Sequence, residues 1–73
     1  MPPLPVLSGA ELIAALRKLG YVSLRQRGSH VRLAAPGRVP VTAPLHATLD
    51  RGTLRAILRA AEITVQELIT LLD

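Results

Sequence analysis

Two histidines and a cluster of arginines are the residues of this chain whose types and spacing suit chemistry. His30 follows a Gly28-Ser29 step, and three arginines lie within five positions of it: Arg25, Arg27 and Arg32. Imidazole exchanges protons near neutral pH, and guanidinium groups bind phosphate through paired hydrogen bonds. RNA carries its own nucleophile, the 2′-hydroxyl, so its cleavage needs a base, an acid and cations around the phosphate. The cluster therefore suits a site that holds a phosphodiester and moves a proton.

The second histidine, His46, lies 16 positions after His30. It could share the acid–base work with His30, or substrate and solvent could supply the other half. Each histidine also has a plain structural interpretation: His30 as a surface strand residue without a role, and His46 as a loop residue bonded to the backbone. Because the chain has no cysteine, few carboxylates and no phosphate-loop motif, we expect neither a metal nor a cofactor.

The first element that could position these residues is a helix. Ser8-Gly9-Ala10-Glu11 matches the S-x-x-E capping box, apolar residues follow at helical spacing, and Gly20 is the expected left-handed terminator. This pattern predicts a helix over residues 9–19. Residues 1–7 contain three prolines and predict an extended, loosely held lead-in.

Three short strands are predicted next, over residues 21–26, 30–34 and 39–43, with turns at 27–29 and 35–38. In the first of them, Val22 and Leu24 share one face. In the second, strand alternation places His30 and Arg32 on an outer, wet face, opposite the apolar pair Val31 and Leu33. The third strand contains Pro40, which cannot donate to a ladder, so we expect this strand at a sheet edge.

Two helical patterns complete the chain. Asp50 is the predicted N-cap of the first, whose apolar face is Leu54, Ile57, Leu58 and Ala61. A second capping box, Thr64-Val65-Gln66-Glu67, predicts a short last helix, unless both patterns form one helix with a break near Ile63. The order α-β-β-β-α(-α) predicts an α+β fold in which helices pack on one face of a three-stranded antiparallel sheet.

Composition sets further limits. Seventy-three residues form one domain, residues 1–73, and such a short chain gains from a stabilising partner or self-association. No acidic residue lies between Glu11 and Asp50, a basic interval that includes Lys18. A basic stretch is typical of nucleic-acid binders, although ordinary solubilising charge is the alternative. The absence of a signal peptide and of a membrane-length apolar run predicts a cytoplasmic protein with no membrane contact.

Three separated blocks resemble the HicA (YcfA-like) mRNA interferase toxins of bacterial and archaeal toxin–antitoxin pairs. The resemblance spans about residues 8–72 and is carried by three sets of residues: Ser8-Gly9-Ala10-Glu11-Leu12 with Leu19-Gly20-Tyr21; Arg25-Gln26-Arg27-Gly28-Ser29-His30; and Pro44-Leu45-His46 with Arg51-Gly52-Thr53-Leu54-Arg55-Ala56-Ile57-Leu58. The central GSH block followed at this distance by GTL-x-x-IL is fairly specific for so short a chain.

This resemblance implies a fold like the double-stranded-RNA-binding domain and metal-independent RNA cleavage with His30 as the catalytic residue. It implies that Gly28 and Ser29 form the turn presenting His30, and that a HicB antitoxin covers the toxin and blocks that histidine. The chain departs from the family pattern at Ala10, where a Lys or Arg is usual, and at Glu62, where a Gly commonly ends the second helix.

The sequence hypothesis is therefore a cytoplasmic endoribonuclease toxin, active in stress responses, whose partners are mRNA and a HicB-like antitoxin. His30 is its general acid or base, His46 is a possible secondary residue, and the phosphate-binding residues are Lys18, Arg25, Arg27 and Arg32. One alternative is a non-catalytic RNA-binding module of the same fold. Another is a protein-binding domain whose basic face docks an acidic partner.

Overall fold

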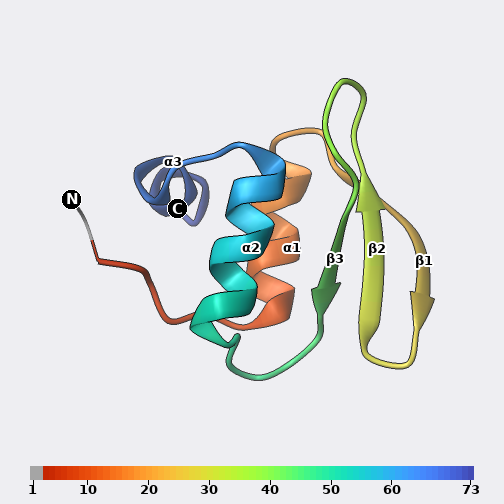
Figure 1. Cartoon of the computed structure of the whole chain (residues 1–73), viewed down its shortest axis with the longest axis horizontal. Coiled ribbons are helices and arrows are strands. Elements are labelled where there is room, and N and C mark those ends of the chain that lie inside the picture. Colours follow the sequence, from red (N-terminus) through yellow and green to blue (C-terminus); the bar gives the residue numbers. More distant parts are fainter. Residues whose placement is uncertain (1–2) are drawn as a thin grey trace.

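A computed structural model, which describes residues 3–73, shows a helix, three antiparallel strands and two further helices (Figure 1). The elements are α1 (Gly9–Arg17), β1 (Val22–Arg27), β2 (His30–Ala34), β3 (Val41–Pro44), α2 (Arg51–Ala61) and α3 (Val65–Leu71). The strands form one sheet in the order β1-β2-β3, and α1 and α2 lie between this sheet and α3 (Figure 1). The predicted α+β fold, similar to the double-stranded-RNA-binding domain, is confirmed.

Both predicted capping boxes form, and they explain where α1 and α3 begin. The Ser8 hydroxyl accepts from the Glu11 amide at 3.1 Å, and the Glu11 carboxylate accepts from the Ser8 amide at 2.8 Å. Thr64 and Glu67 repeat the exchange at 3.0 and 2.8 Å. Replacing such an N-cap with Ala typically costs about 1 kcal/mol of stability.

The core lies between the helices and the inner face of the sheet. Alternation along β2 and β3 turns Val31, Leu33, Val41 and Ala43 inward, as a half-buried sheet requires. The largest fully buried side chains are Leu12, Leu16, Tyr21, Leu33, Leu54 and Leu68. β3 is an edge strand as predicted, but it begins at Val41, so Pro40 precedes the ladder that it could not join.

The predicted looseness of the lead-in is wrong for the part that the structure describes. Leu4 and Leu7 are buried in the core, and the Leu7 carbonyl accepts from the Leu49 amide at 2.9 Å. Burial of both leucines in the core stabilises the ordered conformation of this short segment. Met1 and Pro2 lie outside the described residues.

Helices α2 and α3 are separate, and the break falls at Glu62. This residue ends α2 in the left-handed region, with φ of 58°, where its amide donates to the Arg59 carbonyl at 3.2 Å. A glycine would occupy this conformation without strain. The Arg38 guanidinium donates to the Ala61 carbonyl at 2.8 Å. This bond satisfies one of the carbonyls that the end of α2 leaves without a partner inside the helix.

Tyr21, the one aromatic residue of the chain, is buried just before β1, and its hydroxyl donates to the Val39 carbonyl at 2.8 Å. Burial raises the pKa of Tyr21; the Arg38 charge opposes this shift and the Glu62 charge adds to it. The folded state therefore disfavours the phenolate relative to the unfolded chain.

This raised pKa predicts alkaline destabilisation. The unfolded tyrosine loses its proton near pH 10, so the Tyr21 contribution to the free energy of unfolding is complete below that pH. It should be lost as pH rises from about 10 through the folded pKa, at no more than about 1.4 kcal/mol per pH unit. Urea unfolding across this range should show the fall, and Tyr21→Phe should remove it. Equal pH slopes for the two proteins would contradict the prediction.

Candidate functional site

His30 lies on the outer face of the sheet, away from the helices. It is the first residue of β2 and is exposed. It lines a shallow hollow of about 210 Å³ together with Arg25, Arg27, Arg32 and Thr42. We call these five residues the histidine face. It contains three of the four predicted phosphate-binding residues, and within the described chain its lining includes no carboxylate.

An irregularity in β1 brings two of these arginines to the histidine face. The register shifts between Ser23, which pairs with Leu33, and Arg25, which pairs with Arg32. In a regular strand Ser23 and Arg25 would lie on the same face of the sheet. The register shift inserts Leu24 as an extra residue, a β-bulge, so Arg25 and the residues after it face the side opposite to that expected. Arg25 therefore lies opposite Arg32, and Arg27 lies opposite His30. Directly opposed residues share a face, so all four side chains emerge on the outer side.

The turn that carries His30 is held from two sides. Gly28 has φ of 55°, a left-handed conformation that favours glycine. The Gln26 side-chain amide donates to the Gly28 carbonyl at 2.8 Å, and the Leu45 amide donates to the Ser29 carbonyl at 2.6 Å. The role of Gln26 was not predicted from sequence, although an amide side chain beside a turn glycine was the available signal.

The cations of this face are partly fixed in place. The Arg32 guanidinium donates to the Thr42 hydroxyl across the β2–β3 ladder at 3.0 Å. This contact leaves its remaining N–H groups available to an anion, because guanidinium carries five donors. Arg25 and Arg27 are exposed on the edge strand. Three guanidiniums around one imidazole can hold a phosphodiester beside a proton-transfer group.

The structure also brings His46 to this site. The His30 and His46 ring centroids are 6.4 Å apart and the ring planes meet at 73°. The β2–β3 register explains the approach, because His30 pairs with Pro44, and His46 follows two residues later in the loop after β3. The number of residues between the two histidines could not predict this distance, because the distance between their rings depends on how β2 and β3 pair.

The loop that carries His46 rests on the start of α1. The His46 carbonyl accepts from the Gly9 amide at 3.0 Å. A Cβ at position 9 would overlap the Pro44 carbonyl oxygen, so only glycine permits this approach. The sequence pattern identified Gly9 as part of a capping box and missed this contact.

Lys18 is the predicted phosphate-binding residue that the structure does not bring to the histidine face. Its ammonium donates to the carbonyls of Leu71 at 2.7 Å and Asp73 at 2.6 Å. The positive charge thus lies at the C-terminal end of α3, where the helix dipole favours it. Lys18 therefore joins α1 to α3, and we leave it out of the site.

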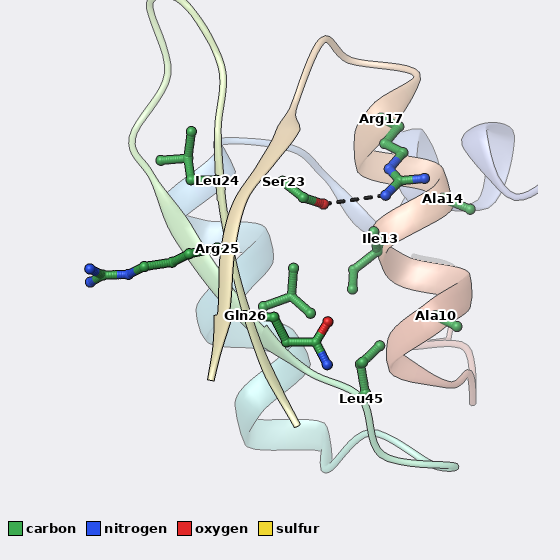
Figure 2. A pocket seen from close by; sticks show the side chains of 10 residues that line it. Ala10, Ile13, Ala14, Arg17, Ser23, Leu24, Arg25, Gln26 and Leu45 are labelled. Carbon is green, nitrogen blue, oxygen red and sulfur yellow. Dashed lines mark hydrogen bonds between the residues drawn. The ribbon is translucent and has the colours of Figure 1, made fainter. Parts of the chain in front are cut away.

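A second hollow, of about 500 Å³, lies on the other side of β1, between this strand and α1 (Figure 2). Figure 2 shows Ser23 and Gln26 turned toward α1, whereas the Arg25 guanidinium extends away from it. The Arg17 guanidinium donates to the Ser23 hydroxyl at 3.2 Å across this groove. The groove and the histidine face are thus on opposite sides of the same edge strand.

Among residues 3–73, no three His, Cys, Asp or Glu side chains come together as metal ligands. None of the helices in this part of the chain combines the length and the apolar character that a membrane span needs.

A family model described as "HicA toxin of bacterial toxin-antitoxin" matches residues 9–63. The match therefore covers α1 to α2, the sheet and both histidines, and ends before α3. No curated protein matches the chain.

Proposed function

The chain belongs to the HicA toxin family of bacterial toxin–antitoxin systems, and on that premise we propose that it is an endoribonuclease that cleaves mRNA in the cytoplasm. In this proposal His30 moves a proton as general acid or base. Arg25, Arg27 and Arg32 hold the phosphodiester and stabilise the negative charge that develops on it. The chain's own side chains perform these steps, and no metal takes part.

The observation that supports this proposal is the composition of the histidine face. An exposed imidazole and three guanidiniums line one hollow on the outer face of the sheet. Oriented cations stabilise the extra charge of a phosphorane-like transition state more effectively than water does, because they need not reorganise. Gly28 and Ser29 support the reaction indirectly, since they form the turn that presents His30.

The proposed partners are RNA and a HicB-like antitoxin. Membership of a toxin–antitoxin family implies a protein that neutralises this chain. The histidine face is open and cationic, so a partner with complementary acidic groups placed over it would exclude RNA. We propose that the antitoxin inhibits by covering His30 in this way.

The test is incubation of the purified protein with total RNA in the presence of EDTA. We expect fragments to accumulate, because imidazole acid–base catalysis needs no divalent cation. RNA that stays intact but binds with a steep salt dependence would instead identify a non-catalytic binding module. Absence of binding even at low salt would contradict both and favour a protein-binding role.

A further inference from the structure

We propose that His46 is the second proton-transfer group of the site, acting on the phosphodiester opposite His30. This inference rests on the proposed ribonuclease function and specifies its mechanism. One histidine removes the proton from the 2′-hydroxyl and the other supplies a proton to the leaving 5′-oxygen.

The first support is the relative placement of the two rings. Their centroids are 6.4 Å apart in an edge-to-face arrangement, and both residues are exposed. At this spacing the two imidazoles can reach the 2′-hydroxyl and the leaving 5′-oxygen through hydrogen bonds of about 2.6–3.2 Å. The deprotonated 2′-oxygen attacks the same phosphorus that releases the 5′-oxygen, so both proton transfers take place around one phosphorus and two nearby rings suffice.

The second support is that the backbone fixes His46 on both sides. The Leu45 amide donates to the Ser29 carbonyl at 2.6 Å, which joins the loop to the turn that presents His30. The His46 carbonyl accepts from the Gly9 amide at 3.0 Å, which joins the loop to α1. A loop histidine held this way keeps its distance from His30, as a preorganised catalytic pair requires.

The third support is that, in the described part of the chain, hydrogen bonds do not already occupy the ring nitrogens. Among residues 3–73, no side-chain hydrogen bond to either histidine ring is found. The alternative role for His46, a ring bonded to the backbone, is therefore not supported. The charged groups that line the hollow with His30 are the three guanidiniums of the histidine face.

The reaction balances without another reactant. A neutral imidazole accepts the 2′-hydroxyl proton as the 2′-oxygen bonds to phosphorus. The bond between phosphorus and the 5′-oxygen breaks, and the protonated second imidazole donates its proton to that oxygen. The products are a 2′,3′-cyclic phosphate and a free 5′-hydroxyl. Proton exchange with water then restores both histidines.

The test is the pH dependence of RNA cleavage by His46→Gln, with Thr48→Ala as a control in the same exposed loop. The wild type should show a bell-shaped dependence of kcat/KM on pH and produce cyclic phosphate ends. His46→Gln should lose one limb of the bell and about 10²–10⁴-fold in rate, the usual effect of one proton-transfer group. Its thermal unfolding midpoint should match that of Thr48→Ala, because the substitution removes only an exposed ring and keeps the backbone hydrogen bonds of Leu45 and His46.

The outcomes separate this inference from the proposed function. If His46→Gln cleaves RNA at nearly the wild-type rate with both limbs intact, the two-histidine mechanism is overturned while the ribonuclease function stands. Products that carry 5′-phosphates would also overturn it, since hydrolysis by water would then replace 2′-hydroxyl attack. A wild-type protein that binds RNA and never cleaves it would remove the function and the inference together.

Discussion

His30→Ala should abolish RNA cleavage and leave the fold intact. Loss of one proton-transfer group usually costs about 10²–10⁴-fold in rate. Stability should change little, because the ring is exposed at the start of β2 and none of the core is removed. Fragment accumulation on total RNA measures the first effect and thermal unfolding measures the second. In cells, induction of this variant should no longer arrest growth.

Leu24→Ala is the matched control. Leu24 is 60% exposed on the edge strand β1 and lies outside the lining of the hollow around His30. This variant should cleave RNA like the wild type. Cleavage retained by His30→Ala would refute the assignment of His30. Loss of cleavage by both variants would show instead that the edge strand itself is needed.

Gly9→Ala has the second large expected effect, and it acts through packing. The added Cβ would occupy the position of the Pro44 carbonyl oxygen, a backbone atom that cannot rotate away. Either the start of α1 or the loop that carries His46 must move, and the bond from the Gly9 amide to the His46 carbonyl is lost. Overpacking costs about 1–3 kcal/mol and a hydrogen bond about 1 kcal/mol. Urea unfolding should show a loss of this combined size.

Gly52→Ala is the natural comparison, because Gly52 also lies in the first turn of a helix. A Cβ there would lie 3.1 Å from the Asp50 carboxylate oxygen that accepts from the Thr53 amide, a side-chain atom that can shift slightly, and would meet no backbone atom from outside the helix. The effect of Gly52→Ala on stability should therefore be small.

In the folded fraction, Gly9→Ala should also cleave RNA more slowly, because His46 is displaced from His30. An unchanged unfolding midpoint for Gly9→Ala would contradict the close approach.

Local patterns were sufficient to predict most of the elements of this protein. The capping boxes at Ser8 and Thr64 and the left-handed Gly20 depend on residues three or four positions apart, so they can be recognised without tertiary contacts. Alternation in β2 likewise predicted that His30 and Arg32 share the exposed face. The weakest prediction was the looseness of the lead-in, because burial of Leu4 and Leu7 depends on a core assembled from distant segments.

The composition of the candidate site was decided by tertiary structure. Arg25 and Arg27 reach the outer face only because the ladder shifts register after Ser23, and simple alternation does not contain that shift. His46 approaches His30 because β3 pairs with β2, whereas Lys18 is drawn to the end of α3. In each case the deciding contact is a strand pairing or a helix contact that no periodic pattern in the sequence contains. The sequence by itself thus determined the helices and the face of His30, and strand pairing and helix packing determined which charged groups and which second histidine lie beside it.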